Sequence, residues 1–286
     1  WSVEHNKQYS PNVNGEGILT RTDIGPRDNY NSIYDVRVGE GVTEISGFNG
    51  MIGLRHVRLP STLRKIRNET FISCTNLVNI IANKSTFPSL TDIGANAFRS
   101  CVNLTTINTQ IMTNLTNIGT AAFLSCDNLT TFFIPDSLAT IPDDMFNFCK
   151  NLTNVTFGQN PGIKMIGNNV FYRCWALSQF NVPSSVVSIR QYAFTPYDIS
   201  KGVSKITFGG GSRLSSLGDY VFGHGDGGFG AMNLTNIVLP SNLKFTGINL
   251  FRNARSNFDI FVFPSKIDYI SHAIFYQEGY TYWAFQ

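Results

Sequence analysis

One motif recurs along nearly the whole chain, and this repetition restricts the possible folds more than any other feature. A phenylalanine returns every 23 to 29 residues, usually with an apolar residue five positions earlier, and a leucine follows each of the first six by six positions. A repeat of about 25 residues cannot bury its own apolar side chains, so successive repeats must stack and share a continuous core. The repetition predicts a solenoid. Its ten phenylalanines are Phe48, Phe71, Phe98, Phe123, Phe146, Phe171, Phe194, Phe222, Phe251 and Phe275.

Each repeat begins with an apolar pattern of helical spacing. Ala97, Phe98, Cys101 and Leu104 stand at i, i+1, i+4 and i+7, which places them on one face of a short helical turn. An asparagine stands just before the leucine, where the left-handed backbone that ends a helix favours Gly or Asn. The pattern predicts a short helical turn that ends at this asparagine. The four asparagines are Asn76, Asn103, Asn128 and Asn151.

Alternating apolar residues follow the predicted helical turn. After Leu129, the buried positions Phe132 and Ile134 alternate with polar or exposed positions, and Pro135 ends the run. This is the pattern of a short, half-buried strand. A second short strand is expected before the next helical turn, as in residues 138–141. We therefore expect an α/β repeat fold, a solenoid of about ten units of 23–29 residues with short strands and short helical turns. The strand pattern also starts at Leu54, Leu177, Leu234 and Phe258.

The ends of the chain differ from its middle. Residues 1–32 lack the repeat and are predicted to form an N-terminal cap, followed by the solenoid over residues 33–286. The sequence begins with Trp1 and no charged-then-apolar leader follows, so we interpret it as a mature or trimmed piece from which any export signal has been removed. No run of about 18 apolar residues occurs, so no membrane span is expected.

The composition excludes several classes of protein. Charged residues make up 14% of the chain and hydrophobic residues 42%, and neutral Asn, Thr and Ser replace the missing charge. This argues against a disordered chain and against a coiled coil. The net charge of +3 and the pI near 8.6 are too mild for a nucleic-acid-binding protein, which needs a concentrated basic face.

The quoted residues resemble the BspA-like leucine-rich repeat family, whose repeats read Ile-Gly-x-x-Ala-Phe-x-x-Cys-x-x-Leu and continue into an Ile-x-Ile-Pro strand. The resemblance covers roughly residues 33–280, and five repeats match at most anchor positions. After Phe194 the cysteine is absent, and a glycine-rich insertion follows Phe222. The resemblance implies a leucine-rich-repeat solenoid of a secreted or cell-surface protein, in a family associated with microbial adhesion to host or neighbouring-cell components.

All five cysteines share one position of the repeat. A disulfide framework would place them irregularly, whereas one cysteine per repeat among apolar neighbours is typical of small buried side chains. We expect free, buried thiols. No histidine or second cysteine stands beside them, so no metal site is expected. They are Cys74, Cys101, Cys126, Cys149 and Cys174.

Eight Asn-x-Ser/Thr sequons leave a further choice open. They are glycan acceptors in a eukaryotic secreted protein, but four of them stand at the repeat position before the core leucine. The structural role of that position is the favoured explanation. The sequons start at Asn68, Asn83, Asn103, Asn114, Asn128, Asn151, Asn154 and Asn233.

No pattern of catalytic residues is present in the sequence. The four histidines are scattered, without H-E-x-x-H or G-x-S-x-G. Gly223, Gly225 and Gly228 satisfy G-x-G-x-x-G, but no strand and helix pair surrounds them, so the stretch is interpreted as a flexible insertion. We expect a protein that is not an enzyme and has no cofactor.

Strand alternation predicts which side chains face outward. These positions are mostly amides and hydroxyls with one aromatic ring, a composition that suits a glycan or a polar protein surface. The alternative is that they only solvate the sheet, and the sequence leaves both open. The candidate binding residues are His56, Arg58, Asn79, Thr106, Asn108, Thr131, Phe133, Asn154, Thr156, Gln179 and Asn181.

A run of basic residues near the N-terminus is a second candidate. It is either a site for an acidic partner, such as a sulfated or sialylated glycan, or a solvated face. Together with the outward strands, it leads us to expect a monomeric, non-catalytic module that binds an extracellular protein or glycan. The competing hypothesis is a spacer that presents another domain. The basic residues are Arg55, His56, Arg58, Arg64, Lys65 and Arg67.

Overall fold

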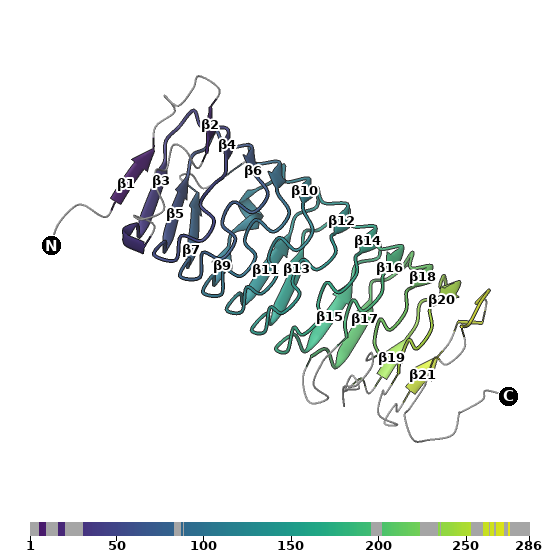
Figure 1. The fold of residues 1–286 in the computed structure, drawn as a ribbon. Helices are drawn as coiled ribbons and strands as arrows, with labels where there is room; N and C mark the ends of the chain where they lie inside the picture. Colours follow the sequence, from purple (N-terminus) through teal and green to yellow (C-terminus); the bar gives the residue numbers. More distant parts are fainter. Residues whose placement is uncertain are drawn as a thin grey trace. The chain divides into compact units, whose positions relative to one another are not determined.

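The computed structural model, whose strands are labelled in Figure 1, divides into two compact units. The N-terminal unit contains Trp1–Leu138 and Val155–Asn160, and the C-terminal unit contains Ala139–Asn154 and Pro161–Gln286. Both belong to a leucine-rich-repeat β-solenoid with about eight turns in all. The structure describes residues 6–9, 17–20, 31–82, 87, 89–195, 202–223, 234, 236–252, 260–262, 264–265, 267–271 and 274.

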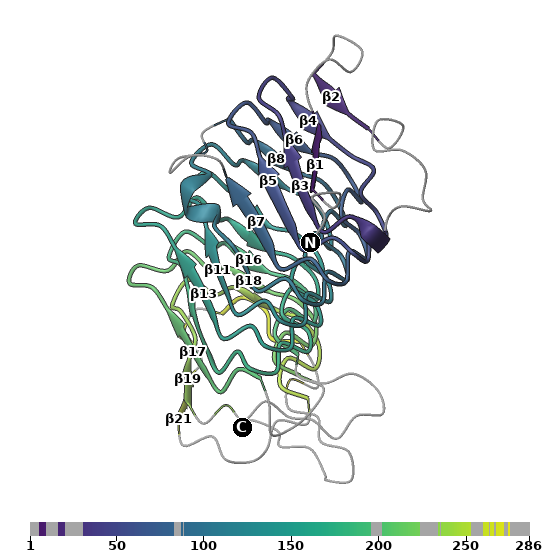
Figure 2. The same cartoon turned by 90° about the vertical axis from the view of Figure 1, so that its left-hand side faces the viewer.

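The N-terminal unit contains two parallel five-stranded sheets, and successive strands of the chain alternate between them, so that each repeat adds one strand to each sheet (Figure 2). We call the odd-numbered strands the face row and the even-numbered strands the back row. The face row orders β1 (Asn6–Tyr9), β3 (Asp35–Val38), β5 (His56–Leu59), β7 (Asn79–Ala82) and β9 (Thr106–Ile107). The back row orders β10 (Asn117–Ile118), β8 (Asp92–Ile93), β6 (Lys65–Ile66), β4 (Glu44–Ile45) and β2 (Ile18–Leu19).

Two further face strands, β11 (Thr131–Ile134) and β13 (Asn154–Phe157), form a separate two-stranded sheet. Strands β1 and β2 lie within the stretch predicted as a cap. They pair in parallel with β3 and β4 and so add one strand to each row.

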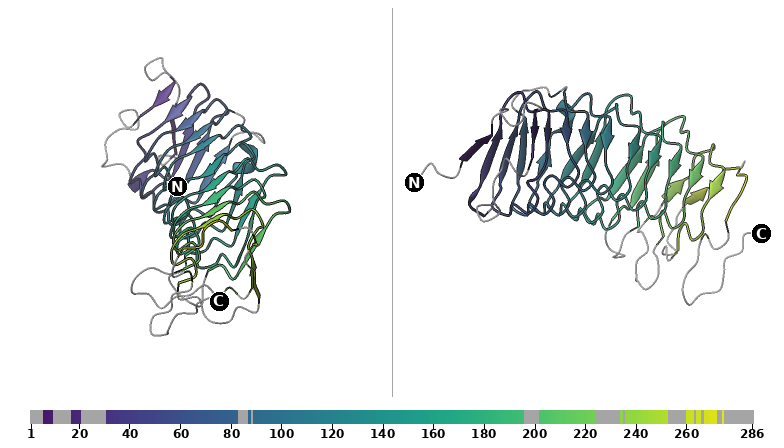
Figure 3. Two further views of the ribbon diagram at one scale, coloured as in Figure 1. Left: turned by 90° about the vertical axis from the view of Figure 1, so that its right-hand side faces the viewer. Right: turned by 45° about the horizontal axis from the view of Figure 1, so that its top comes forward.

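The C-terminal unit repeats the same path of strand, turn and strand (Figure 3). Its back row is a continuous parallel sheet of β12 (Thr140–Ile141), β14 (Met165–Ile166), β16 (Ser188–Ile189), β18 (Ser216–Leu217) and β20 (Phe245–Thr246). Its face row is divided into the pair β15 (Gln179–Val182) and β17 (Lys205–Phe208) and the pair β19 (Asn236–Val238) and β21 (Ile260–Val262). The two strands that the sequence pattern predicts per repeat are thus confirmed.

The predicted helical turns are wrong, and with them the α/β class. On either side of Phe98, Asn96 and Ser100 have left-handed φ angles of 53° and 59°. The Phe98 N–H donates to the Ala122 carbonyl of the next repeat at 2.8 Å, while the Cys101 N–H donates back to Phe98 at 3.1 Å. An α-helix needs every N–H to reach four residues back. The segment is instead a series of β-turns, tied to the next repeat at alternate residues.

This alternation explains why helical spacing misled the prediction. Burying residues at i, i+1, i+4 and i+7 needs one inward face, and a series of tight turns supplies such a face as well as a helix does. Among the described residues, η3 (Thr109–Ile111) is a single 3-10 turn. No helix of the described residues is long and apolar enough to cross a membrane.

The asparagines before the core leucine do not end a helix either. Asn76, Asn103 and Asn128 are absent from the residues with positive φ. Their side chains form a ladder, in which Asn103 Nδ2 donates to Asn76 Oδ1 at 3.3 Å and Asn128 Nδ2 donates to Asn103 Oδ1 at 3.1 Å. Asn76 Nδ2 donates to the Ile52 carbonyl at 2.7 Å. A glycan would attach to the same Nδ2 atom that donates these hydrogen bonds. The ladder therefore supports a structural role for these asparagines rather than glycosylation.

A stack of buried phenylalanine rings forms the core of each unit. In the N-terminal unit Phe48, Phe71, Phe98 and Phe123 follow one another with ring centroids 5.2 to 5.3 Å apart. In the C-terminal unit the spacing is 5.2 to 6.1 Å. The rings of that unit are Phe146, Phe171, Phe194, Phe222 and Phe251.

The five cysteines are free and buried, as the sequence predicts. Cys101 Sγ donates to the Phe71 carbonyl at 3.0 Å, and Cys174 Sγ donates to the Phe146 carbonyl at 3.1 Å. Burial raises the pKa of the Cys74 thiol to about 12 and raises those of Cys101 and Cys174 well above their ordinary value. Phe275, residues 224–230 of the glycine-rich stretch, and the sequons at Asn83 and Asn233 lie outside the described residues.

Candidate binding face

The face strands place the predicted binding residues in rows. His56, Asn79 and Thr106 are neighbours in register across β5, β7 and β9. Along β5, the residue after His56, Val57, is buried and the next one, Arg58, is exposed, as strand alternation requires. His56, Asn79 and Phe133 are half-buried. The exposed members are Arg58, Thr106, Asn108, Thr131, Asn154, Thr156, Gln179 and Asn181.

The structure does not bring the six basic residues together. Arg55, His56 and Arg58 lie at β5 in the face row, whereas Arg64, Lys65 and Arg67 lie at β6 in the back row, which is a different sheet. The turn of residues 60–63 carries the chain from the face row to the back row. Basic residues that are close in the sequence therefore do not form one surface. The run therefore supplies two separate groups of basic side chains.

Acidic neighbours offset part of this charge. Arg67 Nε donates to Glu44 Oε2 at 2.6 Å, and Arg58 Nε lies 3.9 Å from Asp35 Oδ2. The Arg55 guanidinium lies over the ring of Tyr34, 5.9 Å from its centroid. These contacts are those of a solvated surface with local pairing, which is the second of the two interpretations that the sequence leaves open.

A hollow of about 420 Å³ opens on the face of the N-terminal unit. We call it the Phe133 hollow. Strand β9 is two residues long, because the chain turns into η3 after Asn108, and β9 and β11 belong to separate sheets. The Thr109 hydroxyl donates to the Phe133 carbonyl and ties the two segments where the strand ladder is interrupted. The hollow is lined by Thr106, Ile107, Asn108, Thr109, Gln110, Thr131, Phe132, Phe133 and Thr156.

The Phe133 hollow collects five of the predicted residues at one place: Thr106, Asn108, Thr131, Phe133 and Thr156. None of its lining residues carries a charge. Sequence analysis missed two members, Thr109 and Gln110. The signal for them was the repeat after Leu104, where a threonine stands at a core position of the strand pattern and no proline ends the strand.

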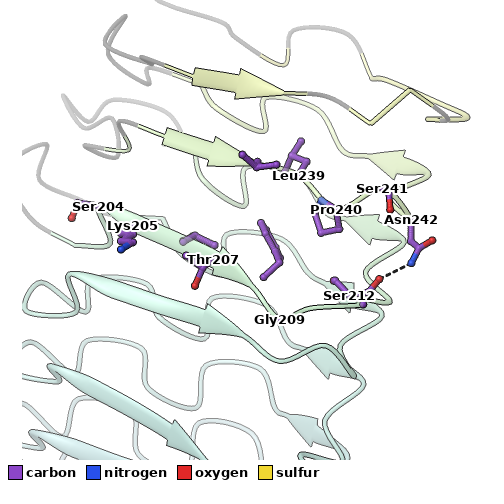
Figure 4. Close-up of a pocket in the computed structure, with 13 residues that line it drawn as sticks. Ser204, Lys205, Thr207, Gly209, Ser212, Leu239, Pro240, Ser241 and Asn242 are labelled. Atoms are coloured by element: carbon purple, nitrogen blue, oxygen red, sulfur yellow. Dashed lines mark hydrogen bonds between the residues drawn. The ribbon is translucent and has the colours of Figure 1, made fainter.

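A larger hollow of about 1090 Å³ lies on the face of the C-terminal unit, between β17 and β19 (Figure 4). We call it the Lys205 hollow. These two strands belong to different sheets, so no strand ladder joins them. After β17 the chain runs through Gly209, Gly210 and Gly211, and Gly211 has a φ of +68° that disfavours other residues. The hollow is lined by Ser204, Lys205, Ile206, Thr207, Phe208, Gly209, Gly211, Ser212, Val238, Leu239, Pro240, Ser241 and Asn242.

The candidate binding residues predicted from the sequence include none of the residues that line the Lys205 hollow. Lys205 and Thr207 are exposed face positions, as strand alternation predicts, but the widening beside them comes from a lost pairing of strands. The available signal was the run of three glycines, which stands where other repeats place a proline after the strand.

Comparison with known proteins agrees with this repeat architecture. Residues 28–132, 82–200 and 199–283 match a family model described as BspA type leucine rich repeat region. No curated protein matches the chain in sequence.

Several crystal structures of bacterial leucine-rich repeat proteins are similar to the chain. A leucine rich cell surface protein from Faecalibacterium prausnitzii is 21% identical with a TM-score of 0.44, over 79% of this chain and 66% of that one. The T. pallidum leucine rich repeat protein is 23% identical with a TM-score of 0.44, over 70% and 77%. A leucine-rich repeat protein from Bacteroides ovatus is 19% identical with a TM-score of 0.43, over 79% and 65%. The chain thus spans just under two thirds of the Faecalibacterium and Bacteroides proteins.

Proposed function

Because the chain belongs to the BspA-type leucine-rich repeat family, we propose that it is a non-catalytic binding module of a secreted or cell-surface protein. It recognises a protein or glycan of a host or neighbouring cell through the outward residues of its face strands. Solenoids commonly bind partners along such an extended face. The observation that carries the proposal is the Phe133 hollow, which gathers four outward polar residues around the half-buried ring of Phe133.

The chemistry of the hollow favours a neutral, hydrogen-bonding ligand. Thr106 and Thr131 are exposed hydroxyls that donate and accept, and the amides of Asn108 and Gln110 do the same. The ring of Phe133 supplies an apolar surface among them. A sugar with hydroxyls at its edges and C–H groups on its faces matches this combination, as does a polar loop of a protein.

The test is a screen against glycan and extracellular-protein arrays with the unmodified protein and Phe133→Ala. Loss of the ring removes the apolar contact, so the ligand found with the unmodified protein should bind at least about tenfold more weakly. Phe245→Ala is the matched control, since Phe245 is 50% exposed but lies on β20 of the back row. Equal binding by unmodified protein and Phe133→Ala would remove this site from consideration.

A spacer that presents another domain is the second candidate. It is favoured by the observation that fixed repeat positions have internal roles, such as the phenylalanine stack and the ladder of Asn76, Asn103 and Asn128. A spacer needs no ligand on the face. The spacer function would be supported if the arrays gave no ligand and if face variants left attachment of the whole parent protein unchanged.

A further inference from the structure

The Lys205 hollow has a defined shape. It follows β17 from Ser204 and continues past the strand to Ser212, with residues 238–242 along its other side (Figure 4). Strand β17 alone extends about 13 Å. The hollow therefore suits an elongated ligand that lies along the strand direction.

The polar groups of the hollow are mostly acceptors toward a ligand. Ser204 Oγ donates to the Ser178 carbonyl at 3.0 Å, and Thr207 Oγ1 donates to Asn181 Oδ1 at 3.0 Å. The Asn242 side chain donates through Nδ2 to the Ser212 carbonyl at 2.6 Å (Figure 4). Because the Ser204 and Thr207 hydroxyls have used their one hydrogen on the protein itself, their oxygens are left to accept hydrogen bonds, and the Asn242 amide keeps its Oδ1 acceptor and one N–H. A ligand with several hydroxyl donors fits them.

One cation stands among these acceptors. Lys205 is exposed, and none of the lining residues is an aspartate or glutamate. In the described part of the chain, Lys205 forms no ion pair with a carboxylate. An ammonium group without such a partner attracts an anionic group of the ligand.

An apolar wall completes the hollow. Val238 is 60% exposed and Pro240 is half-buried, while Leu239 between them is buried in the core. An aliphatic surface beside hydroxyl and amide oxygens matches the C–H face of a sugar ring.

We propose that the Lys205 hollow is a second binding site, which takes an oligosaccharide bearing a carboxylate. The carboxylate contacts Lys205, the hydroxyls donate to Ser204 and Thr207, and the ring packs on Val238. A uronic acid and a sialic acid share this chemistry. The site belongs to the C-terminal unit, so it does not depend on the proposed role of the Phe133 hollow.

The test uses titration calorimetry with three probes: trigalacturonic acid, 3′-sialyllactose and lactose. Binding of either acidic probe and much weaker binding of lactose are expected, and the two acidic probes distinguish the two sources of the carboxylate. Lys205→Gln should weaken binding of the acidic probe about tenfold. Val238→Asp should weaken it further, because it places a negative charge beside the site.

Lys164→Gln is the matched control, because Lys164 is an exposed lysine of the same unit that precedes β14 in the back row. Binding should be unchanged in this variant and in Phe133→Ala. The inference is overturned if neither acidic probe binds up to about 1 mM, or if Lys205→Gln and Lys164→Gln weaken binding equally. Loss of acidic-probe binding in Phe133→Ala alone would move the site to the other hollow and would leave the proposed function standing.

Discussion

The two hollows arise in the same way but differ in chemistry. At each, two neighbouring face strands are not joined by a ladder, while the back row beside them stays paired: β8 with β10 near the Phe133 hollow, and β16 with β18 near the Lys205 hollow. The phenylalanine stack also continues, with Phe98 and Phe123 5.2 Å apart and Phe194 and Phe222 6.1 Å apart. The back row and the phenylalanine stack therefore maintain the fold, and the ladder between face strands can be interrupted without disrupting it.

What fills the gap decides what each hollow can bind. In the N-terminal unit a 3-10 turn brings Thr109 and Gln110 into a neutral hollow with an aromatic ring. In the C-terminal unit three glycines leave a wider hollow in which Lys205 is the charged lining residue. One inner architecture thus carries two surfaces of different charge.

The largest expected effect tests the shared inner part. Phe98→Ala and Phe222→Ala each remove a buried ring from a stack, one in each unit. Each should lower the free energy of unfolding by about 3–5 kcal/mol. Urea unfolding followed by circular dichroism measures it. A loss below about 1 kcal/mol in one of the two variants would show that the two stacks are not equivalent.

The buried Cys74 thiol gives the next effect, a loss of protein stability at alkaline pH. Burial raises the pKa of the Cys74 thiol to about 12, above its ordinary value of 9.0, so the folded state keeps a proton that the unfolded state loses. This contribution is fully present below pH 9 and is lost as the pH rises toward 12. Urea midpoints at several pH values should fall less steeply in Cys74→Ala than in the unmodified protein. If the urea midpoints of the two proteins fall equally with pH, the raised pKa of Cys74 makes no contribution to the pH dependence of stability.

Salt separates the two hollows. Raising the salt concentration from about 20 mM to about 500 mM should weaken the acidic oligosaccharide at the Lys205 hollow several-fold, because screening acts on the Lys205 charge. A ligand of the neutral Phe133 hollow should be unaffected. Calorimetric titration of each ligand at both salt concentrations makes the comparison. Equal salt sensitivity at the two sites would remove the distinction between them.

The smallest effect concerns the asparagine ladder. Asn103→Ala breaks its hydrogen bonds to Asn76 and Asn128 and should cost about 1 kcal/mol of unfolding free energy. Asn108→Ala is the control, because Asn108 is an exposed residue of the Phe133 hollow. It should change stability by less than about 0.5 kcal/mol. Equal losses in both variants would show that the ladder adds no stability beyond a surface residue.

Much of the face could be predicted from the sequence, and its hollows could not. The alternation of Val57 and Arg58 places one side chain inside and one outside, and the structure agrees. Whether neighbouring outward residues lie over a closed ladder or beside a gap depends on hydrogen bonds between strands of different repeats. The missing proline after Thr109 and the three glycines after Phe208 mark repeats that depart from the pattern, but they do not show that a ladder is lost.

The inner repeat follows from the sequence alone: the phenylalanine register, the buried cysteines and the two short strands per turn. These follow from local spacing, because a side chain must point inward wherever the same apolar position recurs. The tertiary structure decided the rest. Backbone N–H groups near Phe98 bond to the next repeat rather than four residues back, which replaces the expected helix with turns. The basic run is divided between two sheets, and the strand ladder of the face row is interrupted at each hollow. The partners of these residues stand a whole repeat away along the chain.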